Sequence, residues 1–538
     1  MNKIIQYFSN KLFWFCVFLI IPALFSTIAI QPISWDLRHY HLYDAYALFH
    51  HRLNFDIAPA LLQSYYAPTL DAFNYLLEAL FPPVVVNFIL GALAGIAFYF
   101  AFEISLWTQS KTHNTKRYFI AVLAMAFTLT AATVWYQIGS WRGESIASIF
   151  VLAAIYLFLQ GIQKRWPYYR VLFISALLIG AATGLKLTMV HCAPAFLAMQ
   201  TIFFCNTNNQ TFRSKLRCFF QSNFIAGIGI VFGFLLLDGY WLWRLYSTFG
   251  NPVFPMFNHF FHSPYALPLN YSNTPGYTPA RDWIHTPLLP FYWLIKRHNY
   301  LIADTFRDAH VAIVFAVTAL FLIYWGYRCY KNKKFMLENN LTLGLAVFYF
   351  VSFYSWAIAF GDIRFLYPTQ LLSGALLVAL VSRFNLRFSI KTLALLAIII
   401  FCFFNTKHPL RRPLETHTSM LLRTQFIPGK VATPPKNSIV LLASFPISFL
   451  IPDYDPSIRF VSISNFLSAH MDTKLQQKAN QLIANNPHNL YTLLYVKDFD
   501  DVSKTLAQYQ LRIDQSSCQT FDKAYWHFEL CRVEGKVD

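Results

Sequence analysis

Charged residues are scarce in this sequence. Only 13% of its 538 residues are Asp, Glu, Lys or Arg, whereas about a quarter of the residues in a soluble globular protein are charged. Hydrophobic residues make up 56% of the chain and aromatic residues 18%. This composition excludes an ordinary soluble protein and indicates an integral membrane protein.

Acidic side chains are particularly few. The chain has 25 Asp and Glu against 43 Lys and Arg, which gives a formal net charge of +18. In a soluble protein this excess would suggest a nucleic-acid partner, but here the basic residues form short clusters between apolar runs and not one continuous face. We therefore expect no nucleic acid partner.

Metal-binding patterns are also missing. The eight cysteines show no CxxC spacing and no nearby pair of histidines, so the sequence predicts no metal site and requires no cofactor, although a divalent metal stays compatible with it. Six cysteines lie in or beside apolar runs and suit buried packing. Cys518 and Cys531 lie in the polar C-terminal segment, and they can form a disulfide if that segment is outside the cytoplasm.

Long apolar runs dominate what is present. The first, residues 12–30, is also compatible with a signal peptide, but it lacks a small-x-small cleavage site before Trp35 and is long enough to span a membrane. We expect it to be a retained helix. Including it, the sequence predicts about eleven transmembrane helices, at residues 12–30, 84–106, 118–134, 145–161, 171–185, 188–205, 219–237, 309–327, 341–360, 366–382 and 390–405.

The basic clusters set the predicted topology. With a cytoplasmic N-terminus, every inner loop is basic, as the positive-inside rule requires. The clusters at residues 164–170 and 213–217 both belong inside, which requires two crossings between them and hence a hairpin at Lys186. Most carboxylates before residue 407 then lie outside, which indicates that the outer face carries the function.

Two outer segments and a C-terminal region are too long for simple loops. In the segment 31–83 we expect amphipathic helices at residues 37–49 and 68–80 that lie along the membrane surface. The other long segment is 238–308. After residue 406, strand-like and helical patterns alternate. The sequence thus predicts an α-helical polytopic membrane module, residues 1–406, and a soluble extracytoplasmic α/β domain, residues 407–538.

The most informative stretch, SWDLRHYHLYDAYALFHHR, follows the first helix. It places a carboxylate, Asp36, where the chain leaves the membrane, with Tyr40 and His41 on the next turn. A different interpretation is that Asp36 only caps the N-terminus of the following helix.

The architecture resembles that of the GT-C superfamily of glycosyltransferases, which use polyprenyl-phosphate-linked sugars. An acid in the first outer loop, many spans and an outer C-terminal domain carry the resemblance across nearly the whole chain. Three local patterns are also similar, namely GAATGLK at residues 180–186, FGNPVFPMFN at 249–258 and RFLYP at 364–368. The first-loop signature of the family often pairs two acids, whereas Leu37 follows Asp36 here, so the subfamily stays open.

The resemblance implies an inverting transfer of a sugar from a lipid-linked donor to a lipid, glycan or protein acceptor, in a bacterial inner membrane. Asp36 would deprotonate the acceptor hydroxyl, and Lys186, Arg364 and Arg142 would bind the donor phosphate. These basic residues lie at outer helix ends, where long side chains also reach toward the headgroups without any further role. Glu144 and Asp238 can assist, although a salt bridge with Arg142 or a helix cap explains Glu144 equally well.

Two other functions stay open. An O-antigen-type polymerase or ligase would use the basic residues of the long outer loop, which are Arg281, His285, Arg297, His298, Arg307 and His310. A multi-pass transporter is the third hypothesis, but the sequence shows no convincing internal repeat, and its polar residues lie at helix ends and not at mid-membrane.

Overall fold

The computed structural model describes most of the chain as two compact units. The described residues are 10–30, 34–110, 112–204, 212–269, 271, 286–294, 307–332, 340–406, 412–413, 430–464, 471–523 and 526–535. Unit 1 comprises Met1–Ala29, Asn87–Leu237 and Pro275–Arg411. Unit 2 comprises Ile30–Val86, Asp238–Thr274 and Arg412–Asp538. The two long loop segments therefore fold mainly with the C-terminal region.

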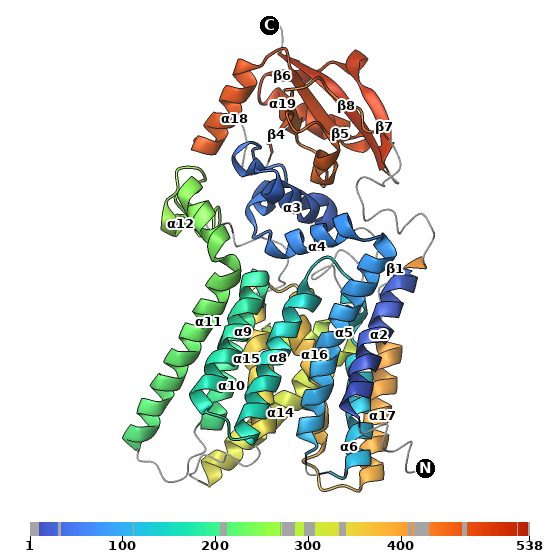
Figure 1. Cartoon of the computed structure of the whole chain (residues 1–538), viewed down its shortest axis with the longest axis vertical. Coiled ribbons are helices and arrows are strands. Elements are labelled where there is room, and N and C mark those ends of the chain that lie inside the picture. The colour runs from blue at the N-terminus through green and yellow to red at the C-terminus, as the bar shows by residue number, and fades with distance from the viewer. Residues whose placement is uncertain are drawn as a thin grey trace. The chain divides into compact units, whose positions relative to one another are not determined.

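Unit 1 is a bundle of apolar helices (Figure 1). In chain order, the long helices of the protein are α2 (Lys11–Ile28), α5 (Pro83–Thr108), α6 (Asn114–Thr128), α8 (Glu144–Gln163), α9 (Tyr168–Leu185), α10 (Cys192–Phe204), α11 (Phe212–Phe249), α14 (Ala309–Lys331), α15 (Asn340–Ala359), α16 (Tyr367–Val381) and α17 (Phe388–Asn405). Each predicted span corresponds to one of them. The fold is that of a multi-pass membrane protein.

The predicted number of spans is only approximate. Nine helices in the described part of the chain are long and apolar enough to cross a membrane. The two that fall short are α6, with 15 residues, and α10, with 13. The predicted span 118–134 is wrong at its end, because α6 stops at Thr128 and a separate short helix, α7 (Ala132–Gln137), follows.

The predicted break at Lys186 is present. Lys186 is the residue that ends α9, its backbone is extended, and the short helical turn Leu187–His191 leads into α10. The preceding glycines serve helix packing. A Cβ at Gly180 would collide with the carbonyl oxygen of Ile230 on α11. A Cβ at Gly184 would lie 2.7 Å from the carbonyl oxygen of Phe234, also on α11. Close backbone approach at small residues is typical of membrane helices.

Unit 2 contains the α/β fold that the C-terminal pattern predicts. Its sheet has the order β4-β3-β5-β8-β6, and β7 also pairs with β8. The strands are β3 (Ile439–Leu442), β4 (Arg459–Ser462), β5 (Leu490–Tyr495), β6 (Leu511–Ile513), β7 (Gln519–Lys523) and β8 (Trp526–Gly535). The strands β4, β3 and β5 are parallel, in the register Ile439 with Arg459 and with Leu490, and β8 is antiparallel to β5. The helices α18 (Lys474–Asn485) and α19 (Phe499–Ala507) connect them.

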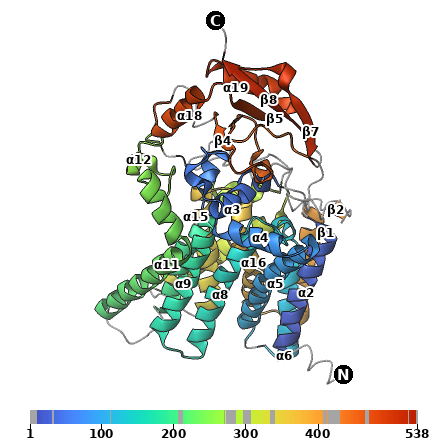
Figure 2. The same cartoon turned by 45° about the horizontal axis from the view of Figure 1, so that its top comes forward.

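The first loop packs on the edge of this sheet. Its helices are the π-helical turn Leu37–His41, α3 (Leu42–Phe49) and α4 (Thr69–Leu80), and Figure 2 shows α3 beside α4. Ile57 forms a parallel bridge with Val461 of β4. Arg52 forms a bidentate ion pair with Asp56 at 2.6 and 2.8 Å and donates to the carbonyl of Ile458. The loop is thus bonded to the sheet.

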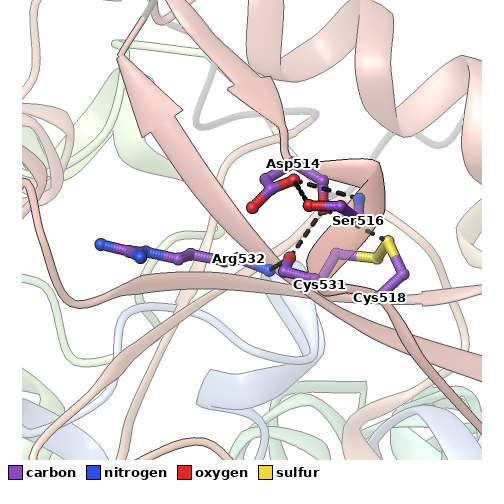
Figure 3. The surroundings of a disulfide bond; sticks show 6 residues. Asp514, Ser516, Cys518, Cys531 and Arg532 are labelled. Atoms are coloured by element: carbon purple, nitrogen blue, oxygen red, sulfur yellow. Dashed lines mark hydrogen bonds between the residues drawn. A yellow bond between two sulfur atoms is a disulfide. The ribbon is translucent and has the colours of Figure 1, made fainter.

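The predicted disulfide is also present (Figure 3). Cys518 precedes β7 and Cys531 lies on β8, and their sulfur atoms are bonded. Asp514, next to the bond, accepts hydrogen bonds from the backbone and hydroxyl of Ser516. The cross-link therefore holds the turn between β6 and β7 against the long strand β8.

Candidate functional site

A group of charged residues gathers in unit 1 around Lys186. The ammonium of Lys186 lies 3.0 Å from Oε1 of Glu144 and donates to the backbone carbonyl of Arg142. Glu144 is fully buried and Lys186 nearly so. Because a buried carboxylate is costly without a cation, this pair explains how Glu144 stays in the interior.

Arg364 belongs to the same group. The guanidinium carbon of Arg364 lies 4.9 Å from the centre of the Phe365 ring, and the ammonium of Lys186 lies 6.0 Å from it. Arg364 also pairs with Asp362 at 2.7 Å. A ring nitrogen of His191 lies 2.9 Å from the carbonyl oxygen of Phe365, and since a carbonyl only accepts, this nitrogen donates. That bond holds the RFLYP segment in place.

Arg142 and Glu144 lie at the start of α8. Gly143 occupies the N-cap position, so the interpretation of Glu144 as the cap is wrong, and the ion pair that Glu144 makes is with Lys186. The guanidinium of Arg142 lies 4.3 Å from the ring of Tyr136. Lys186 thus contacts Glu144, the backbone of Arg142 and the Phe365 ring that Arg364 also contacts, and we call Lys186, Arg364, Arg142 and Glu144 the cation cluster.

Asp36 lies on the π-helical turn of the first loop. Its backbone is helical and its side chain caps nothing, whereas the hydroxyl of Ser34 accepts from the backbone of Leu37. The interpretation of Asp36 as the cap is therefore wrong. Short π-helical turns occur often at functional sites.

The neighbours of Asp36 are anchored on the sheet of unit 2. Arg38 donates to the hydroxyl of Tyr495 at 2.9 Å and stacks 4.3 Å above the ring of Trp526. His39 is fully buried against Trp35, with ring centres 4.1 Å apart. Burial lowers the pKa of His39 to about 4, although the carboxylate of Asp36 acts to raise it, so His39 is neutral at pH 7.

A second acidic group lies between α3 and α4. His41 and Asp71 are buried and paired, with Nδ1 2.7 Å from Oδ1. On α4 the polar residues Asp71, Asn74 and Glu78 are buried, while Phe73, Leu76 and Leu80 are exposed. The spacing i, i+3, i+7 places the polar residues on one helical face. Of these residues, only His41 was proposed as a site residue from the sequence. The i, i+3, i+7 spacing of Asp71, Asn74 and Glu78 could have indicated a polar face on this helix.

Asp44 completes this group. It is buried, and neither of its carboxylate oxygens has a hydrogen-bond partner in the described part of the chain. Burial, and then the charge of Asp71, raise the pKa of Asp44 well above its ordinary value. Beside it is a cavity of about 10 Å³, which has room for about one water molecule. Its other lining residues include Tyr43, Asp56, Ser64, Tyr65 and Trp241.

The remaining predicted residues are more scattered. Tyr40 lies on the π-helical turn, with its ring centre 4.1 Å from that of His41, and Asp238 is buried on α11. His310 is buried, stacks on Phe127 and bonds Ser373, which suits a structural role. Arg307 bonds Asn405. The other four residues of the long loop, Arg281, His285, Arg297 and His298, lie outside the described residues.

The described residues offer one grouping of metal-ligand side chains. It consists of Cys518, Glu529 and Cys531. Since the two sulfur atoms are bonded to each other, this grouping is a disulfide and not a metal site.

Comparison with known proteins identifies the fold. No family model and no curated protein sequence matches the chain. Among solved structures, ArnT from Cupriavidus metallidurans bound to undecaprenyl phosphate matches with a TM-score of 0.52 and 9% identity, over 98% of both chains. An oligosaccharyltransferase from Archaeoglobus fulgidus matches 92% of this chain and 71% of its own at 13% identity, with a TM-score of 0.44. The chain therefore shares its fold with ArnT over nearly its whole length, in agreement with the fold that the sequence predicted.

Proposed function

We propose that the protein transfers a sugar from a polyprenyl-phosphate-linked donor to an acceptor hydroxyl on the extracytoplasmic face, with inversion at the sugar. The observation that carries the proposal is the cation cluster in a chain with the GT-C fold. Lys186 pairs there with Glu144, and Arg364, which pairs with Asp362, contacts the same Phe365 ring as Lys186. Arginine and lysine at such a site suit a phosphate headgroup.

The cation cluster would stabilise the leaving group. When the bond between the sugar carbon and the phosphate oxygen breaks, its electron pair stays on the lipid phosphate, and fixed cations stabilise that charge. The ammonium of Lys186 has three N–H donors. One donates to the Arg142 carbonyl, and the ion pair with Glu144 lacks hydrogen-bond geometry, so N–H groups are left that suit a phosphate oxygen.

Asp36 would act as the base. It would take the proton of the acceptor hydroxyl while the acceptor oxygen bonds to the sugar carbon from the side opposite the phosphate. Asp36 is half-buried and directly precedes the π-helical turn, which supports this role. Tyr40 and His41, on the same turn, would help to position the acceptor. Asp238 is the weaker candidate for assistance, and Glu144 would tune the cation cluster.

The disulfide supports the proposed topology. Disulfides persist in oxidising compartments, so Cys518–Cys531 is consistent with a C-terminal domain outside the cytoplasm and a cytoplasmic N-terminus. We propose the bacterial inner membrane as the location. The acceptor would be a lipid, glycan or protein on the outer side.

A transfer assay tests the proposed function. The wild-type protein in lipid vesicles is mixed with a panel of undecaprenyl-phosphate sugars and with membranes from a strain that lacks the chain. The wild type should label an acceptor, and Asp36→Asn should lower the rate by about 10²- to 10⁴-fold, the usual contribution of a general base. Asp501→Asn, at an exposed position on α19, is the matched control. Full activity of Asp36→Asn would contradict the proposed role.

A further inference from the structure

In the loop that follows α11, two polar residues are buried and two large apolar residues are exposed. We call residues 250–263 the aromatic loop. Asn251 and Asn258 are fully buried inside it. The Asn251 amide donates to the Met256 carbonyl, and the Asn258 amide donates to the Ser263 and Ala266 carbonyls. These bonds satisfy backbone carbonyls from within, and the buried Phe254 stacks on Phe249, so the loop has a fixed shape.

Large apolar side chains are exposed on the same loop. Phe260 is 72% exposed and Phe257 is 42% exposed. Phe257 also has a φ of 52°, a left-handed conformation that is unfavourable for a residue with a Cβ. The fold therefore accepts both backbone strain and apolar exposure at one residue. Strain of this kind persists where the surrounding structure holds it for a purpose.

The end of α11 carries the same kind of surface. Tyr240, Trp243 and Tyr246 are exposed at a spacing of three residues, hence on one side of the helix. Tyrosine and tryptophan are enriched where membrane helices pass the headgroups. The helix is a membrane-spanning candidate up to Phe249, and the aromatic loop begins at the next residue. Exposed aromatic residues are thus present both at the end of a candidate membrane helix and in the loop that follows it directly in the chain.

We propose that the aromatic loop is a membrane anchor that inserts Phe257 and Phe260 among the lipid headgroups. The loop contains no Asp, Glu, Lys or Arg, which suits a lipid environment, because burying a charge there is costly. Continuity with the membrane helix favours lipid over a second copy of the chain.

If the loop is a membrane anchor, the length of α11 determines how far this helix must tilt in the membrane. Its 38 residues make a helix about 57 Å long, whereas a bilayer with its headgroups is about 40–45 Å thick. An upright α11 would lift the loop clear of the lipid. The proposal therefore requires α11 to tilt by about 40°, at the upper end of the range for membrane helices.

Spin labels test the anchor directly. Single cysteines replace Phe260 and Phe257 in a protein whose free cysteines are changed to serine, and the labelled full-length chain is reconstituted in vesicles of phosphatidylethanolamine and phosphatidylglycerol. Phe224→Cys, on the exposed apolar face of α11, is the lipid reference, and Asp500→Cys on α19 is the water reference. If the cysteine-free protein fails to fold, a labelled keto amino acid at Phe260 replaces the cysteine.

The label at Phe260 should be accessible to oxygen and shielded from a water-soluble nickel complex, close to the value at Phe224. A value equal to that at Asp500 would overturn the proposal. Shielding from both reagents, together with a dimer in detergent, would also overturn it, because the loop would then contact a second copy. The measurement needs no substrate, so it is independent of the proposed transfer reaction.

Discussion

Removing the charge of Lys186 should affect stability and binding through different partners. In Lys186→Met the Glu144 carboxylate, which is fully buried, loses its cation. Breaking a buried pair in this way costs about 3–5 kcal/mol. The lipid phosphate would lose one charge-assisted hydrogen bond, worth about 1.5–3 kcal/mol, which weakens its affinity about 10- to 100-fold.

A second substitution separates the two effects. Glu144→Gln removes the orphaned charge, so Lys186→Met/Glu144→Gln should regain most of the lost stability while binding undecaprenyl phosphate as weakly as the single variant. The assay measures the melting temperature in detergent and the affinity for undecaprenyl phosphate in nanodiscs. Lys504→Met, which breaks the exposed pair with Asp501, controls for loss of a surface charge and should change neither value. Wild-type affinity in the double variant would refute the reasoning.

Three further predictions concern stability. The raised pKa of Asp44 means that its carboxyl resists ionisation in the folded protein, so stability falls as the pH rises above the unfolded pKa of about 4. Asp44→Asn should therefore raise the melting temperature at pH 8 relative to the wild type but not at pH 4. Equal shifts in melting temperature at the two pH values would contradict this. Gly180→Leu should reduce the yield of monodisperse protein in gel filtration, because the leucine side chain would collide with the Ile230 backbone. Gly227→Leu, at a position with open space, should be tolerated. Equal yields of the two variants would be inconsistent with close packing of α9 and α11. Cys531→Ser should destabilise the C-terminal sheet by about 3 kcal/mol and speed its proteolysis, and chemical reduction of the wild type should reproduce the effect.

Much of the architecture was predictable because it rests on local patterns. The basic clusters fixed the break at Lys186, and the structure places the end of α9 there. Alternation of strands and helices after residue 430 predicted the sheet, and the polar setting of Cys518 and Cys531 predicted their bond. The end of α6 was mispredicted, since apolar residues continue past Thr128 while the helix stops.

The candidate sites depend on contacts between distant residues, which local patterns do not show. Nothing in the sequence near Ile57 indicates that it pairs with Val461, about four hundred positions away. The π-helical turn at Asp36 was also hidden, because its hydrogen bonds run to i+5 and leave no periodicity over five residues. The pair Arg52–Asp56 had a visible i, i+4 spacing, but its bonds to the β4 segment did not.

The central proposal is that the cation cluster binds a lipid phosphate and that Asp36 acts as the base in the transfer. An experimental structure with bound undecaprenyl phosphate measures this most directly. We predict that a phosphate oxygen lies about 3 Å from the ammonium of Lys186, and that the Asp36 carboxylate lies within about 8 Å of the phosphorus, which leaves room for one sugar carbon and one acceptor oxygen. A phosphate bound elsewhere, or an Asp36 carboxylate more than about 15 Å from it, well beyond hydrogen-bond reach, would contradict the account.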